Sequence, residues 1–120
     1  MASHNELGQK GEKIAEKHLL QKGYEILDRN FRFKRDEIDL VAAKGDQIVF
    51  VEVKTRANDY LGEPEEAVTK SKQKRIIAVA NHYVIENNIE KEARFDIIAI
   101  VFNQNTERIH HIEDAFQPLW

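Results

Sequence analysis

The chain has 120 residues, no cysteine and a formal net charge of −3 at pH 7. This length suffices for one domain with a real hydrophobic core, so we expect a single domain over residues 1–120. The content of 42% hydrophobic and 32% charged residues is typical of a globular protein and excludes a disordered tail. The absence of cysteine excludes disulfide frameworks and thiolate zinc sites, and the negative net charge argues against a protein that coats nucleic acid non-specifically.

The sequence also lacks membrane and targeting signals. No apolar run approaches the length of a membrane-spanning helix, and residues 1–6 contain no signal-peptide core. Because a chain without cysteine fits a reducing compartment, we expect a cytoplasmic protein with no membrane association. Local basic surface is still compatible with the net charge, since clustered charges dominate locally.

The first predicted element is a helix over residues 7–22, because the glycine at position 23 supplies a C-terminal stop. Four residues recur at helical spacing on one face of this helix, and the acidic one among them is expected to point inward. These four residues are Gly8, Glu12, Ala15 and Leu19.

Three strands are predicted next, over residues 24–33, 37–43 and 47–54. The last two are joined by a tight turn at Lys44-Gly45-Asp46 and therefore form a hairpin. The polar residues 55–63 that follow are expected to form a loop.

A second helix is predicted from Pro64, which suits a first turn, to about Asn87. The acidic residues Glu63, Glu65 and Glu66 would complement the helix dipole. The residues expected to be buried on this helix are Val68, Ile76, Val79, Ala80 and Tyr83. A nearly apolar strand over 95–102, covered on both faces, and a more exposed strand over 107–113 complete an α/β order of helix, three strands, helix and two strands.

The hairpin carries charged residues in runs that otherwise predict buried strands, namely Glu37-Ile38-Asp39 and Val51-Glu52-Val53-Lys54. Burying such groups without partners is costly, so strands rarely contain them without a reason. Counting outward from the turn pairs Asp39 with Glu52 and Glu37 with Lys54. Directly opposed residues have Cβ atoms about 4.5–5.5 Å apart, and two like charges at that separation are destabilising unless a cation lies between them.

The chemistry of these groups points to a metal-dependent site that acts on phosphodiesters. Carboxylate oxygens suit Mg²⁺ or Mn²⁺, which can activate water and neutralise charge on phosphorus. Lys54, on the same face as Glu52, could orient that water or stabilise the transition state. Glu12 could complete the site from the first helix, and Lys72 is in line with the buried face of the second helix.

Five segments carry a resemblance to a known family over almost the whole chain. They are Gly8-Gln9-Lys10-Gly11-Glu12, Glu37-Ile38-Asp39-Leu40-Val41, Phe50-Val51-Glu52-Val53-Lys54-Thr55-Arg56, Lys72 and Arg94-Phe95-Asp96. The chain resembles the YraN-like family of uncharacterised bacterial proteins, of the PD-(D/E)xK, restriction-endonuclease-like nuclease superfamily, which is similar to archaeal Holliday junction resolvases. A glycine usually precedes the Glu-Ile-Asp segment in that family, whereas this chain has Asp36.

The resemblance implies a restriction-endonuclease-like core of αβββαβ order with an extra C-terminal strand, in which helices flank a mixed central sheet. It implies Asp39 and Glu52 as ligands of Mg²⁺, with Mn²⁺ as a substitute, and the backbone carbonyl of Val53 as a further ligand. Lys54 would correspond to the catalytic lysine, and Glu12 to the acid of the first helix.

Other charged residues have structural interpretations. Asp96 opens a strand and is expected to be a hydrogen-bond acceptor rather than a ligand. His110 and His111 point to opposite faces of a strand, so they and the isolated His4, His18 and His82 are treated as non-catalytic. Trp120 would either cap the core or join a partner.

Basic residues surround the predicted site and suggest how DNA would approach. The predicted nucleic-acid-binding residues are Arg32, Lys34, Arg35, Arg56, Lys72 and Arg75. They would contact phosphates, which gives position and salt-dependent affinity rather than base specificity. By analogy with the resolvases, the substrate would be branched or single-stranded DNA, and a symmetric homodimer would follow for a two-fold symmetric junction.

We therefore expect an Mg²⁺-dependent endonuclease that hydrolyses DNA phosphodiester bonds. The alternative is a non-catalytic nucleic-acid-binding protein of the same fold, which would bind DNA without turnover. A third interpretation is an interaction protein in which Asp39 and Glu52 serve only as charge partners of Lys54.

Overall fold

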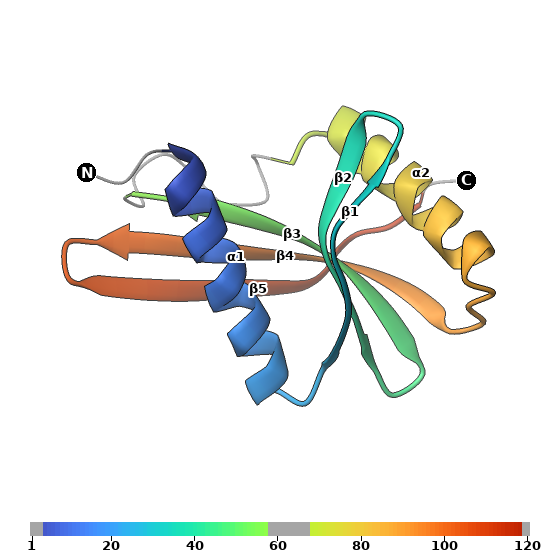
Figure 1. Cartoon of the computed structure of the whole chain (residues 1–120), viewed down its shortest axis with the longest axis horizontal. Helices are drawn as coiled ribbons and strands as arrows, with labels where there is room; N and C mark the ends of the chain where they lie inside the picture. Colours follow the sequence, from blue (N-terminus) through green and yellow to red (C-terminus); the bar gives the residue numbers. More distant parts are fainter. Residues whose placement is uncertain (1–3, 58–67, 119–120) are drawn as a thin grey trace.

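The computed structural model describes residues 4–57 and 68–118. Its elements follow the predicted order of helix, three strands, helix and two strands (Figure 1). They are α1 (His4–Gln21), β1 (Glu25–Phe33), β2 (Asp36–Lys44), β3 (Gln47–Arg56), α2 (Lys70–Glu86), β4 (Glu92–Asn103) and β5 (Thr106–Phe116). Within these two ranges, neither helix combines the length and the apolar character needed to cross a membrane.

The five strands form one mixed sheet in the order β1-β2-β3-β4-β5. The neighbours β3 and β4 are parallel, and every other pair is antiparallel. Parallel neighbours need a crossover connection, and the segment that contains α2 supplies it. The strands twist strongly across the sheet, as Figure 1 shows.

The two helices cover opposite faces of this sheet, so the protein has three layers. Along β3, Val49 and Val51 pack in the cluster that contains Ala15 and Leu19 of α1. The alternate residues belong to the cluster of α2, and they include Ile48 and Phe50, together with Val79, Ala80 and Tyr83. Successive residues in the middle of β3 and β4 are therefore buried on both faces of the sheet, which explains the apolar runs of these strands.

The second helix begins later than predicted. Its N-cap is Thr69, which is extended and whose side chain accepts a hydrogen bond from the backbone N–H of Lys72 at 3.2 Å. This cap makes Lys70 the first helical residue, because a threonine oxygen satisfies a free amide of the first turn. Val68 is buried as predicted, although it precedes the helix. Pro64 and the glutamates around it, like Trp120, lie outside the described residues.

Helix α1 approaches β3 closely at Gly11, a buried residue. A Cβ atom at this position would overlap with the side-chain Oγ1 of Thr55. Gly11 is therefore the residue that allows the helix to lie against the end of β3, one position before Glu12.

We expect Gly11→Ala to destabilise the protein by about 1–3 kcal/mol, because the added methyl group forces the helix away from Thr55. Gly8→Ala is the matched control on the same helix, since a Cβ there meets no atom within 4 Å. This control should gain about 0.5–1 kcal/mol from helix propensity. Urea unfolding measures both changes, and equal effects of the two substitutions would contradict the close approach.

Candidate metal centre

The predicted hairpin register is confirmed near the turn, where β2 and β3 pair from Lys44–Gln47 to Leu40–Val51. The paired residues stop there, one position before Asp39 and Glu52. The Asp39 side chain instead reaches across to β3, where its Oδ2 accepts a hydrogen bond from the backbone N–H of Val53 at 2.7 Å. The two strands therefore separate at Asp39, and its carboxyl group satisfies an amide that the ladder leaves free.

The predicted facing pairs of Asp39 with Glu52 and of Glu37 with Lys54 are wrong, because the β2–β3 ladder ends at Leu40 and Val51. Glu37 is paired with Arg32 in the β1–β2 register, and its carboxylate accepts from the Arg32 Nε at 3.0 Å. The physical reason is the separation of β2 from β3, which leaves β1 as the neighbour of this end of β2.

Although the ladder ends early, the structure brings the predicted site residues together. Glu12, Asp39, Glu52, Val53 and Lys54 line one pocket of about 340 Å³. Glu12 comes from α1, Asp39 from β2 and the other residues from β3. The inward orientation predicted for Glu12 is therefore confirmed.

Asp39 is the most perturbed acid of this pocket. Burial raises the pKa of its carboxyl group to about 8, and the negative charge of Glu52 adds to the increase. The hydrogen bond from Val53 acts in the opposite direction, whereas the charges of Glu12 and Glu37 raise the pKa further. In the metal-free protein, burial and the charge of Glu52 therefore favour the protonated form of Asp39.

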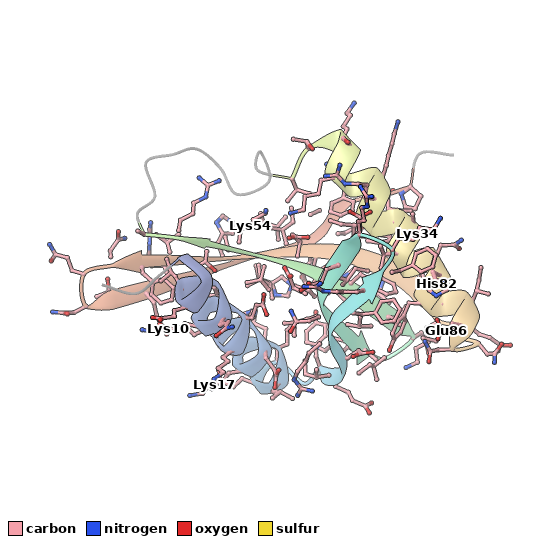
Figure 2. The ribbon with its side chains drawn as sticks, turned by 45° about the horizontal axis from the view of Figure 1, so that its top comes forward. Lys10, Lys17, Lys34, Lys54, His82 and Glu86 are labelled. Atoms are coloured by element: carbon pink, nitrogen blue, oxygen red, sulfur yellow. The ribbon has the colours of Figure 1, made fainter. Side chains whose placement is uncertain are left out.

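Two lysines neutralise the neighbouring carboxylate of Glu52, which is buried. Its Oε1 lies 3.1 Å from Lys72 Nζ and 3.9 Å from Lys54 Nζ. Lys54 extends from β3 and is labelled in Figure 2. Burial and the hydrogen bond with Lys72 lower the pKa of Lys54. Burial alone would also lower the pKa of Lys72, but the bond with Lys54 and the charge of Glu52 raise it.

Glu37 and Asn30 also belong to the site, and sequence reasoning missed both of these roles. Carboxylate oxygens of Glu12, Glu37 and Asp39 lie within 4.8 Å of one another. The Asn30 side-chain amide donates to Glu12 at 3.0 Å and to Glu37 at 2.8 Å, so it holds the two glutamates together. The available signal was an asparagine inside a predicted strand, where this residue is uncommon. Asn30 has φ of +51°, in the left-handed region that asparagine tolerates.

These donors fit a hard divalent cation. They are all oxygens, and a cation bound beside the half-buried Asp39 carboxyl group, whose pKa is raised, would favour its ionised form. Mg²⁺ and Mn²⁺ prefer such ligands and usually keep several waters, for which the pocket has room.

Some of the predicted nucleic-acid-binding residues gather beside the acids. Arg35, Lys72 and Arg75 line a second pocket of about 270 Å³, on whose wall Asp39 and Glu52 also lie. Of the remaining residues predicted for this role, Arg32 and Lys34 are exposed and Arg56 is half-buried at the end of β3. Arg29, a further basic residue of β1, is instead held by two hydrogen bonds to Glu16 of α1.

Asp96 is a structural hydrogen-bond acceptor, as predicted. It is fully buried, and its two oxygens accept from Arg94 at 2.9 and 2.8 Å, from His111 at 2.7 Å and from the Asp114 backbone N–H at 3.0 Å. Although burial alone would raise the pKa of Asp96, these hydrogen bonds lower it. The Arg94 guanidinium also pairs with Glu113 at 3.3 Å and so takes the place that a metal ion would need between Asp96, His111 and Glu113.

Sequence reasoning also missed a contact between two histidines. His18 Nε2 of α1 lies 3.1 Å from His111 Nδ1 of β5, and His111 continues the chain of hydrogen bonds to Asp96. The two residues are 93 positions apart, so no local pattern could have paired them. The network ties the first helix to the last strand and is a structural feature.

The fold and the site define an α/β protein with an acidic, lysine-flanked pocket beside a β-hairpin. Comparison with known proteins identifies its family. The model of the uncharacterised protein family UPF0102 matches residues 11–100, which include Glu12, Asp39, Glu52 and Lys54. The chain belongs to this family, which confirms the predicted YraN-like membership.

Three relatives illustrate how complete the similarity is. A UPF0102 protein of Christiangramia forsetii is 44% identical over 116 residues, which cover 97% of this chain and 98% of that protein. A UPF0102 protein of Bacteroides thetaiotaomicron is 46% identical over 118 residues, 98% of each chain. A third, from Clostridioides difficile, is 45% identical over 115 residues, 95% of this chain and 99% of that protein.

Proposed function

We propose that this protein is a restriction-endonuclease-like, PD-(D/E)xK nuclease that hydrolyses DNA phosphodiester bonds with Mg²⁺. One observation carries the proposal. Asp39, Glu52 and Lys54 line a single pocket, although placing one buried and one half-buried acid beside a half-buried lysine is costly unless they have a task. The order of helix, three strands, helix and strand, with β3 parallel to β4, is compatible with the core expected from the resemblance.

The residues of the pocket have separate roles in the proposed reaction. Asp39, Glu52 and the Val53 carbonyl would hold Mg²⁺, with Glu12 assisting from α1. When bound, the ion would supply Lewis-acid stabilisation of the charge that develops on the phosphate. Lys54, whose pKa is lowered, is suited to accept at Nζ the proton of the water that attacks phosphorus. Glu52 and Lys54 lie in the β3–β4 ladder, and the hydrogen bond from Val53 ties the Asp39 carboxyl group to the same strand, so the three side chains are held in place.

The substrate would be held through its phosphates. Arg35, Lys72 and Arg75 lie on the wall of the pocket that adjoins the acids, and ammonium and guanidinium groups bind phosphate oxygens. Such contacts give structure-selective binding, and by the resemblance we propose branched or single-stranded DNA, cleaved in the cytoplasm by a symmetric homodimer.

A nuclease assay tests the activity. Wild-type protein should cleave branched, flapped or single-stranded DNA in the presence of Mg²⁺ or Mn²⁺, and Asp39→Ala should reduce the rate at least ~100-fold, as loss of an electrostatic catalytic group does. Asp46→Ala, in the exposed hairpin turn, is the control and should cleave at the wild-type rate. If wild type and Asp39→Ala are equally inert on every substrate, the catalytic assignment fails.

A non-catalytic nucleic-acid-binding role is the second candidate. The observation in its favour is the ion pair between Lys72 and Glu52, which gives the buried carboxylate a partner without any metal. This role predicts DNA affinity without turnover, and affinity that is unchanged or improved when Asp39 or Glu52 is neutralised.

A further inference from the structure

Lys72 holds a ligand atom of the proposed metal centre. Its Nζ lies 3.1 Å from Glu52 Oε1, closer than Lys54 Nζ, which lies 3.9 Å from the same oxygen. The Glu52 side chain is only 8% exposed, so water offers this carboxylate little alternative solvation. The ammonium of Lys72 is therefore the main counterion of Glu52 in the metal-free protein.

The two partners meet at a boundary between two pockets. Asp39 and Glu52 line both the 340 Å³ pocket on the α1 side and the 270 Å³ pocket on the α2 side. Lys54 lines the first pocket, whereas Lys72 lines only the second. Lys72 thus reaches Glu52 from a different pocket than the one that Glu12 lines.

The other acids of the α2-side pocket already have partners. Asp36 is paired with Arg75 at 3.5 Å, and Glu37 with Arg32 at 3.0 Å. If the Lys72 ammonium left Glu52, both of these acids would therefore already be paired with an arginine. The ammonium would become available to an anion that enters the pocket beside Arg35.

We propose that Lys72 is a positioning residue that couples metal binding to phosphate binding. A divalent cation at Glu52 displaces the Lys72 ammonium, which then binds a phosphate of the nucleic acid in the α2-side pocket. The inference rests on the proposed function, because it requires a metal at Asp39 and Glu52. By thermodynamic linkage, phosphate binding at Lys72 must strengthen metal binding by the same factor.

Calorimetric titration of the full chain with Mn²⁺, without DNA, tests the first half of this proposal. Lys72→Met removes the competing ammonium and should bind Mn²⁺ about tenfold more tightly than wild type, the change that a lost interaction of about 1.4 kcal/mol produces. Lys74→Met removes the same charge from an exposed position on the same helix and should change the affinity less than about twofold. Lys72→Arg retains a cation for Glu52 and should resemble wild type.

Binding of a phosphorothioate single-stranded oligonucleotide, with and without Mn²⁺, tests the second half. Mn²⁺ should increase the affinity of wild type and of Lys74→Met by similar factors, and the factor for Lys72→Met should be at least about fivefold smaller. Urea unfolding of each variant is the control that checks that all of the compared proteins are folded.

The outcomes separate the two proposals. If wild type binds Mn²⁺ and Lys72→Met binds it no more tightly, the coupling role is overturned and the metal centre stands. An equal gain in the Lys72 and Lys74 variants also overturns the coupling role, because it would reflect net charge alone. If no variant binds Mn²⁺, both the metal centre and the coupling are overturned.

Discussion

An Asp39→Asn variant is expected to be more stable than the wild type above pH 8, by about 2–5 kcal/mol, and to lose most of its affinity for Mn²⁺. The pKa of Asp39 is raised from 3.8 to about 8 in the folded protein, so the folded state binds this proton more tightly than the unfolded chain. The stability that the proton contributes is complete below pH 4 and is lost as the pH rises to about 8. Each pKa unit corresponds to about 1.4 kcal/mol.

Asparagine avoids this loss because it cannot ionise, and its side-chain oxygen can still accept the hydrogen bond from Val53. Urea unfolding of both proteins between pH 4 and pH 9 measures the difference, and Asp46→Asn in the exposed turn is the control. If the free energies of unfolding of wild type and of Asp39→Asn changed in parallel with pH, the Asp39 carboxyl group would not be responsible for the loss of stability at high pH. Calorimetry at pH 8 should show Mn²⁺ affinity reduced at least ~10-fold by Asp39→Asn, because an amide is a weaker ligand than a carboxylate.

Replacing Asp96 by alanine should lower the free energy of unfolding by about 3–5 kcal/mol at pH 7. The substitution leaves the half-buried Arg94 guanidinium without its main counterion and removes the acceptor of His111 and of the Asp114 amide. Breaking a buried ion pair from one side typically has a cost of this size. Because its hydrogen bonds lower the pKa of Asp96, the stability that it contributes is present above about pH 4 and is lost as the pH falls further.

Glu113→Ala is the matched control, since Glu113 is a second partner of the same guanidinium but its side chain is 61% exposed. This variant should lose less than about 1 kcal/mol, as exposed ion pairs usually do. Urea unfolding at pH 7 compares the two, and similar losses from both substitutions would contradict the central position of Asp96 in the network.

Most of the fold could be predicted because its signals are local. The strands of the hairpin were predicted to within two residues, since apolar runs and a glycine turn define them. The start of α2 was mispredicted, because Pro64 and its neighbouring glutamates resemble a first turn as well as Thr69 does. The first residue of α2 depends on which side-chain oxygen caps the helix, and amino-acid composition alone cannot determine that residue.

The candidate site was predictable in part for the same reason. Asp39 and Glu52 lie one position beyond the last pair of a hairpin register that can be counted from its turn, so their proximity could be predicted although their pairing was wrong. Asn30 and Glu37 escaped prediction because their roles depend on the separation of β2 from β3 and on a left-handed backbone at Asn30. The pair of His18 and His111 depends on the packing of the first helix against the last strand, which requires the complete fold.

The parallel pairing of β3 with β4 has a kinetic consequence. It joins Gln47–Arg56 to Glu92–Val101, and this pairing can form only after the segment containing α2 has closed a long loop. Contacts of such sequence separation are typical of slow folding steps, whereas the β2–β3 hairpin can form early. Lys72 lies within that loop, so Glu52 can receive its counterion only when the loop closes. During refolding, the acidic hairpin would thus exist transiently without its lysine partner.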